Sequence, residues 1–338
     1  MNKISRRNFL GMSTKLTMGT LFAGTFAPTA TSFFGLGGVA EAKTKKISPF
    51  TFAILSDAHL YSMKEHKFDA TLQKAVDDVN SMDPKPDFVL YGGDLGQSGK
   101  RVELEKGKKI LDTLKVPYRI ITGEHDYYLD MGEAWRGLFG AEYWSFDHKG
   151  VHFIGMNSIR VKDFWTAKNL TPEERMGWME ELECHRCGLW GVGAEQLEWL
   201  AKDVKKISPD TPVFIMTHSP LWDYYPRWNF QTLDAPEIRQ ILSKFEKVMA
   251  VHGHVHQIVY NKIGNITSAG LLSTSWPWPY PPVELPHPAI KMNRVDPGNM
   301  EDGLGAHQVS VSEDFAGMLN YRTFAHLLPE NVKRGLKL

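Results

Sequence analysis

Short runs of apolar residues that each end in Asp or His recur between residues 50 and 256 of this 338-residue chain. The stretches PFTFAILSDAH, PDFVLYGGD and VPYRIITGEHD predict three buried strands, and PVFIMTHSP and KVMAVHGHVH predict two more. Between the first strands, apolar residues from Phe68 to Val79 recur at helical spacing, and residues 102–115 predict a second helix. The pattern predicts a βαβαβ unit of an α/β fold, in which ligands bind at the carboxyl ends of the strands.

The following segments fit the same fold class until about residue 270. YWSFDHKGVHFIGMNS alternates around the turn His148-Lys149-Gly150 and predicts a β-hairpin, and residues 193–206 predict a helix. STSWPWPYPPVELPHP contains six prolines, which excludes regular structure there.

With 42 % apolar residues the chain can form one large domain or two small ones. We expect a single domain over residues 43–338, with an irregular C-terminal part from about residue 271.

The first 42 residues have the layout of an export signal. SRRNFL at residues 5–10 resembles a twin-arginine signal, and the charge-free stretch 16–40 runs into the small-residue triplet AEA at 40–42. We therefore expect the twin-arginine export machinery to recognise this segment and a peptidase to cleave it after Ala42. The mature protein is then expected to be periplasmic or otherwise exported. The alternative is an uncleaved membrane anchor, which the many Gly and Thr residues of the stretch disfavour.

Charge and cysteine content restrict the partners. Four bases and one acid lie in the first 42 residues, so 35 bases face 38 acids beyond them and the mature chain is near −3. This balance offers no general attraction for a nucleic-acid duplex or an anionic membrane, and we expect no stable membrane insertion after signal cleavage. The CxxC pair Cys184 and Cys187 predicts a local disulfide in an exported protein, with zinc binding or redox chemistry as alternatives.

Polar residues at the five predicted strand ends form the candidate site. Each alone has a structural explanation, because an Asp after a strand often caps a turn and a lone His is usually a hydrogen-bonded structural residue. That explanation would have to hold at five strand ends in succession, all of which carry nitrogen or oxygen donors suited to divalent metals. The set comprises Asp57 and His59, Asp94, Glu124 with His125 and Asp126, His218, and His254 with His256.

The ordered blocks SDAH, GGD, GEHD, THSP and GHVH resemble those of the calcineurin-like metallophosphoesterases, the superfamily that includes purple acid phosphatases and bacterial cyclic-nucleotide phosphodiesterases. The resemblance covers residues 50 to about 275. It implies a four-layer αββα sandwich with two metal ions, Fe, Mn or Zn, at the carboxyl ends of the strands. It also implies hydrolysis of a small phosphomonoester or phosphodiester by a hydroxide shared between the two ions.

The resemblance assigns a role to each residue of the blocks. His125 is expected to contact the phosphoryl group or the leaving oxygen, and Asp126 to orient the His125 ring. His252 matches no ligand position and is expected to be structural or to support its neighbours. One metal takes Asp57, His59 and His256, the other takes Glu124, His218 and His254, and Asp94 bridges the two.

Glu124 departs from the family pattern, which usually has Asn in this block. With Asp57 and Asp94 it brings a third negative charge, so two divalent ions and one hydroxide give a neutral centre where Asn would leave one positive charge. The change makes the metals weaker Lewis acids, or it favours a trivalent ion such as Fe(III) in one position. Alternatively, Glu124 turns away to pair with a Lys or Arg, and the second metal keeps a water.

Three functions stay open from the sequence, of which hydrolysis of a phospholipid headgroup is the third and is disfavoured because no basic cluster accompanies the aromatic residues around Trp276. The first is an exported dimetal phosphoesterase, and the second is a non-catalytic metal-binding or partner-binding protein on the same scaffold, which Glu124 motivates. The presence of His125 favours the enzyme, because binding metal alone does not require it. Trp276, Trp278 and Tyr280 follow the last block, and they either stack on a substrate or pack over the open end of the sandwich.

Overall fold

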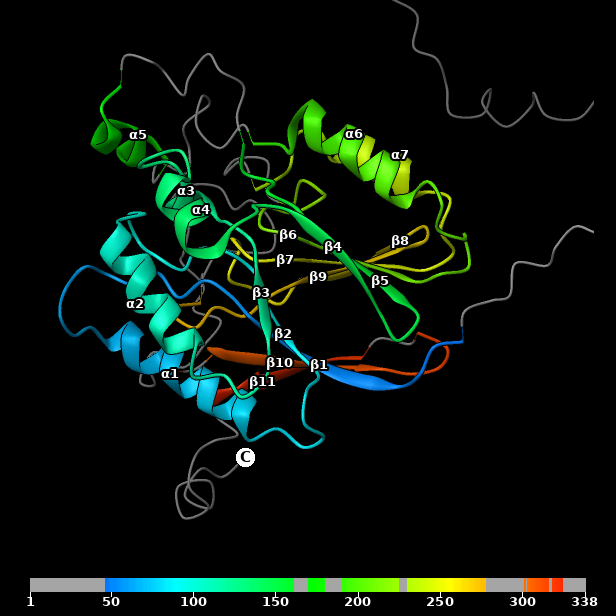
Figure 1. Cartoon of the computed structure of the whole chain (residues 1–338), viewed down its shortest axis with the longest axis horizontal. Coiled ribbons are helices and arrows are strands. Elements are labelled where there is room, and N and C mark those ends of the chain that lie inside the picture. The colour runs from blue at the N-terminus through cyan, green and yellow to red at the C-terminus, as the bar shows by residue number, and fades with distance from the viewer. Residues whose placement is uncertain are drawn as a thin grey trace, which may run out of the picture. The chain divides into compact units, whose positions relative to one another are not determined.

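The computed structural model describes residues 46–160, 170–179, 190–224, 230–277, 301, 303–315 and 318–324 (Figure 1). The expected export signal, the Cys184 and Cys187 pair, Trp278 and Tyr280 lie outside these ranges. None of the helices within the ranges has the length and apolar character that crossing a bilayer requires.

The first of two β-sheets contains the three strands that begin the domain. Its order is β11-β10-β1-β2-β3, in which β1, β2 and β3 run parallel and β10 pairs antiparallel with β1. The strands are β1 (Phe50–Leu55), β2 (Val89–Tyr91), β3 (Tyr118–Ile120), β10 (Gly305–Val311) and β11 (Met318–Thr323).

The second sheet has the order β4-β5-β6-β7-β9-β8, with β5, β6, β7 and β9 parallel. The hairpin predicted around residues 148–150 is confirmed, because β4 and β5 pair antiparallel with His148 opposite Val151. The strands are β4 (Trp144–His148), β5 (Val151–Gly155), β6 (Val213–Thr217), β7 (Val248–His252), β8 (Tyr260–Ile263) and β9 (Ile266–Gly270).

Helices connect the parallel strands and cover the outer faces of the two sheets (Figure 1). The first helix starts where the His66 side chain accepts a hydrogen bond from Phe68 N and the Asp69 carboxylate accepts one from His66 N, which caps two free backbone donors. The helices are α1 (Lys67–Asn80), α2 (Arg101–Leu111), α3 (Glu124–Tyr127), α4 (Glu133–Phe139), α5 (Pro172–Met179), α6 (Gly193–Val204) and α7 (Ala235–Leu242).

Apolar clusters on both faces of each sheet hold the layers together. Alternate residues of β1 point to opposite sides, so Phe52 and Ile54 pack against the second sheet while Ala53 and Leu55 face α1 and α2. Burial on both faces explains why the β1 sequence is a continuous apolar run. On the far side of the second sheet, the strands pack against α6 and α7 through residues such as Leu200. The four-layer αββα architecture predicted from the sequence is confirmed.

The C-terminal part differs from the prediction. We expected an irregular segment from about residue 271, but β10 and β11 form two regular strands that complete the first sheet. The strands lie beyond the proline-rich stretch that suggested irregularity. Polar residues such as His307 and Gln308 lie buried on β10, which breaks the apolar pattern by which strands are recognised.

Candidate metal centre

The carboxyl ends of parallel strands from both sheets bring the predicted ligands together. Asp57 follows β1, Asp94 follows β2, and Glu124 opens α3 after β3. From the second sheet, His218 follows β6, and the GHVH block follows β7. All seven predicted metal ligands are buried, and they fall into groups whose donor atoms lie within 4.8 Å of one another.

The grouping matches the two expected ligand sets. One group is Asp57, His59 and His256, a second joins Glu124, His218 and His254 with Asp94, and a third, formed by His59, Asp94 and His125, shares members with both. Asp94 Oδ2 lies 3.1 Å from His218 Nε2 and 3.5 Å from His59 Nε2, so it stands between the two groups. This is where a bridging carboxylate belongs, because a single oxygen atom can face both ions.

The backbone at the ligands is strained in a way that supports a functional site. Five of them have left-handed φ values, a conformation that non-glycine residues rarely adopt and that concentrates at active sites. The Asp57 carbonyl accepts hydrogen bonds from Ser273 Oγ at 2.8 Å and Ser275 Oγ at 2.7 Å, which hold this turn in place. The five φ angles are 56° at Asp57, 48° at His59, 53° at Asp94, 63° at His254 and 44° at His256.

Metal ions would satisfy polar atoms that the protein leaves without partners. Asp94 Oδ2, Glu124 Oε2 and His218 Nε2 are buried, and within the described ranges they form no hydrogen bond of good geometry, although both carboxylate oxygens lie within 3.1 Å of His218 Nε2. Buried polar atoms are nearly always hydrogen-bonded, so three such atoms that face one another suit a shared cation. Nitrogen and carboxylate oxygen donors fit Zn, Mn or Fe, and the residues present therefore fit a dimetal centre.

Carbonyl oxygens fix the rings of three histidine ligands. His218 Nδ1 lies 2.7 Å from Gly92 O, His256 Nδ1 lies 2.9 Å from Trp276 O, and His59 Nδ1 lies 3.0 Å from Gln97 Oε1. A carbonyl oxygen can only accept, so in the neutral ring each Nδ1 carries the proton and each Nε2 presents its lone pair to the centre. His254 differs, because its Nδ1 lies 2.9 Å from Glu124 Oε1.

Charges inside the centre oppose the effect of burial. Burial raises the pKa of Glu124, but the neighbouring His254 and His218 outweigh it and hold that pKa well below its ordinary value. Burial lowers the pKa of His218, but Asp94 and Glu124 outweigh it and hold that pKa well above its ordinary value. Both directions show that the carboxylates attract positive charge to this position.

Glu124 points into the centre. Its side chain is 4 % exposed, with Oε1 2.9 Å from His254 Nδ1 and Oε2 2.9 Å from His218 Nε2. The alternative, in which Glu124 turns away to pair with a Lys or Arg, would require these oxygens to leave the two histidines. The geometry therefore favours Glu124 as a ligand in the second group.

His125 and Asp126 are adjacent in sequence but have different surroundings. His125 Nδ1 lies 2.6 Å from Gln97 O, and its Nε2 lies 3.9 Å from Glu124 Oε1. The Asp126 carboxylate instead accepts hydrogen bonds from Gly96 N at 2.8 Å and Gly123 N at 3.1 Å. Burial, together with the nearby Asp94, raises the pKa of Asp126 to about 7.

The orienting role expected for Asp126 must therefore be corrected. Its carboxylate ties the loop after β2 to the start of α3, and a backbone carbonyl of Gln97 takes the place that we expected for it against His125. The sequence could not indicate this contact, because any residue type carries a backbone carbonyl. Gln97 is the functional residue that the sequence reasoning missed.

His252 and Trp276 lie beside the centre. His252 is buried with its Nδ1 3.1 Å from Gly253 O, and burial lowers its pKa to about 4, so it is a neutral neighbour of the ligands. The Trp276 ring lies 4.3 Å from the His59 ring and 4.9 Å from the His256 ring. Of the three aromatic residues predicted near the substrate, Trp276 thus borders the metal ligands.

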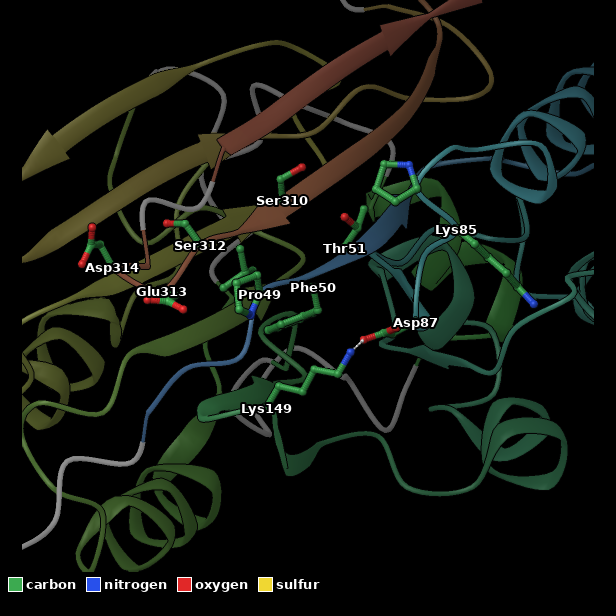
Figure 2. Close-up of a pocket in the computed structure, with 12 residues that line it drawn as sticks. Pro49, Phe50, Thr51, Lys85, Asp87, Lys149, Ser310, Ser312, Glu313 and Asp314 are labelled. Atoms are coloured by element: carbon green, nitrogen blue, oxygen red, sulfur yellow. Dashed lines mark hydrogen bonds and ion pairs between the residues drawn. The ribbon is translucent and has the colours of Figure 1, made fainter.

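A shallow hollow lies at the other end of β1 (Figure 2). It has a volume of about 890 Å³ and is lined by Pro49, Phe50, Thr51 and residues from other segments. The Lys149 side chain reaches Asp87 at its rim, with Nζ 2.7 Å from the carboxylate. Phe50 begins β1 whereas Asp57 follows its end, so this hollow is not part of the metal centre.

Comparison with known proteins agrees with this geometry. The chain matches the calcineurin-like phosphoesterase family over residues 50–258 and belongs to that family, so it is a metal-dependent phosphoesterase. It is 28 % identical over 228 residues to a probable glycerophosphodiester phosphodiesterase of Arcobacter nitrofigilis, covering 64 % of this chain and 76 % of that protein. It is 21 % identical over 236 residues to a 3′,5′-cyclic-nucleotide phosphodiesterase of Nostoc sp., covering 68 % and 79 %.

A solved structure shows the same fold. A dimetal phosphatase from Danio rerio superposes with a TM-score of 0.54 at 14 % identity, covering 78 % of this chain and 93 % of that one. The likeness extends over most of both chains. At this identity it supports the architecture and not a substrate.

Asp94 occupies the space into which a side chain at position 123 would extend, so a substitution of Gly123 tests the metal centre. A Cβ at Gly123 would collide with Asp94 Oδ1, although the Gly123 backbone, with φ −106°, suits any residue. We expect Gly123→Ala to displace Asp94 and weaken metal binding by roughly 10-fold or more. Metal titration into chelator-stripped protein, with circular dichroism to confirm folding, measures the effect.

Gly137→Ala is the matched control, because nothing lies within 4 Å of a Cβ at that position in α4. We expect this control to bind metal as the wild type does. A folded Gly123→Ala protein with wild-type metal affinity would contradict the placement of Asp94 between the two ligand groups.

Proposed function

We propose that this protein hydrolyses small phosphodiesters at a centre that holds two metal ions. The observation that carries the proposal is the buried set of seven donor residues with the His125 ring beside it, 13 % exposed. Relatives named as phosphodiesterases support the ester class. The non-catalytic alternative does not account for His125, because binding metal alone does not require that residue.

Glu124 supports a diester over a monoester. If Asp57, Asp94 and Glu124 all ligate, two divalent ions and a hydroxide give a neutral centre, where a neutral residue at position 124 would leave one positive charge. Coulomb energy scales with the product of the charges. Loss of the single positive charge from the centre therefore weakens the binding of a dianionic monoester about twice as much as that of a monoanionic diester. We therefore propose Glu124 as both a metal ligand and a determinant of substrate charge.

The chain's own residues position the reaction. When bound, the two ions supply Lewis-acid stabilisation of phosphoryl oxygens and lower the pKa of water enough to yield a nucleophile near neutral pH. His125 keeps one proton on Nδ1 for the Gln97 carbonyl, so only its imidazolium form can donate from Nε2 to a leaving oxygen. The Trp276 ring, beside His59 and His256, offers an aromatic face to the organic part of the ester.

Substitution of His125 tests the enzyme directly. We expect His125→Ala to lower kcat on an aryl phosphodiester by about 10²–10⁴-fold, because general acid catalysis contributes about that much, while both metals stay bound. Elemental analysis beside steady-state kinetics on paired aryl monoester and diester substrates checks both statements. Two metals per chain with no hydrolysis of either ester, and no effect of the substitution, would support the binding-protein alternative.

Substitution of Glu124 tests the charge argument. Glu124→Gln keeps the size of the side chain and removes its charge, so at saturating metal we expect the ratio of kcat/KM for diester to kcat/KM for monoester to fall several-fold. Metal content measured on the same samples shows whether both ions remain. A ratio equal to that of the wild type, with both ions bound, would remove Glu124 as a determinant of substrate charge.

We also propose that the chain is exported through a twin-arginine pathway and cleaved after Ala42. The support is the sequence alone, in which SRRNFL precedes a charge-free stretch and AEA. Export of a folded protein suits an enzyme that acquires its metals before crossing the membrane. We expect the double substitution Arg6→Lys and Arg7→Lys to retain the full-length chain in the cytoplasm, as cell fractionation would show, whereas an exported double variant would contradict the pathway.

A further inference from the structure

Gln97 contacts two functional rings at once. It lies in the loop between β2 and α2, three residues after Asp94. Its side-chain Oε1 lies 3.0 Å from His59 Nδ1, and its backbone oxygen lies 2.6 Å from His125 Nδ1. Its own backbone N donates to Leu60 O at 2.9 Å, which fixes the loop against the segment that carries His59.

Each contact determines which nitrogen faces the centre. With Nδ1 donating to Gln97, His59 turns its Nε2 toward Asp94 Oδ2, 3.5 Å away. In the same way, His125 directs its Nδ1 to the backbone oxygen of Gln97, which leaves its Nε2 on the side of Glu124. The centroids of the two rings lie 4.7 Å apart, and the rings meet edge to face at 77°.

The side-chain contact differs from the other braces of the centre. Backbone carbonyls of Gly92 and Trp276 hold His218 and His256, and no substitution removes a backbone carbonyl. Among the three carbonyl contacts to ligand rings described above, only that of Gln97 comes from a side chain. A change at position 97 can therefore loosen one ligand ring and leave the backbone contact to His125 in place.

We propose that Gln97 is a positioning residue that holds the metal ligand His59 through its side chain and the His125 ring through its backbone carbonyl. The proposal rests on the proposed dimetal function. The side chain sets the affinity of the position formed by Asp57, His59 and His256, and the other position does not depend on it. The carbonyl orients the His125 ring through its contact with Nδ1.

The side-chain part is tested with Gln97→Leu, which removes the acceptor at similar volume, and Gln97→Glu, which keeps an oxygen at the same reach. Mn²⁺ is titrated calorimetrically into the chelator-stripped full chain. We expect Gln97→Leu to weaken one of two binding events by about 10–100-fold and Gln97→Glu to recover most of that loss.

The backbone part is tested by ¹⁵N spectroscopy of histidine-labelled protein, with the His125 signal assigned by its absence in His125→Ala. We expect a neutral His125 ring to carry its proton on Nδ1 in both the wild type and Gln97→Leu. A proton on Nε2 would overturn this part.

Gln73→Leu is the matched control, because Gln73 lies on α1 and bonds Asp77, away from the centre. Its two affinities should equal those of the wild type. Equal weakening of both events in Gln97→Leu, no recovery in Gln97→Glu, or wild-type affinities in Gln97→Leu would overturn the side-chain part while the dimetal function stands. A wild-type chain that binds no metal would overturn the proposed function and this proposal together.

Discussion

The Asp94 carboxylate is the point on which the centre depends. It leaves β2 in a left-handed turn with φ 53°, and its Oδ2 faces histidines from both ligand groups. Its Oδ1 accepts the backbone N–H of His125 at 3.1 Å, so the same side chain also fixes the start of α3. Asp94, at the end of the first sheet, thereby links the candidate ligands of both sheets and the backbone of His125.

The sandwich core makes this arrangement possible by holding strained loops in place. Each candidate ligand residue in the left-handed backbone region lowers the stability of the fold by roughly 1 kcal/mol relative to ordinary backbone. Hydrogen bonds between the loops offset that cost. Asp57 N donates to Gly93 O and His59 N donates to Asp94 O, each at 3.0 Å. Because the strands that feed these loops are packed on both faces, the loops have little freedom to relax.

The sequence predicts the parts of this protein that depend on side-chain pattern. Buried parallel strands require continuous apolar runs, and metal ligands at their ends require Asp, His or Glu, so the βαβαβ unit and the positions of the candidate ligands could both be predicted. The bonds of Asp126 to Gly96 N and Gly123 N, and that of His125 to the Gln97 carbonyl, could not, because backbone groups carry no sequence signal. The strands β10 and β11 were missed for a related reason, since buried polar residues such as His307 interrupt the pattern.

In the proposed centre, seven side chains hold two metal ions, with Asp94 between them and Glu124 as a ligand. The most direct measurement is a crystal structure of the protein as purified, with anomalous data collected at the absorption edges of the metals found by elemental analysis. If the proposed centre is correct, two anomalous peaks are expected about 3.5–4 Å apart. One should lie beside His59 and the other beside His218, with Glu124 in contact with the second. A single peak, or two peaks with the Glu124 side chain turned away from both, would contradict it.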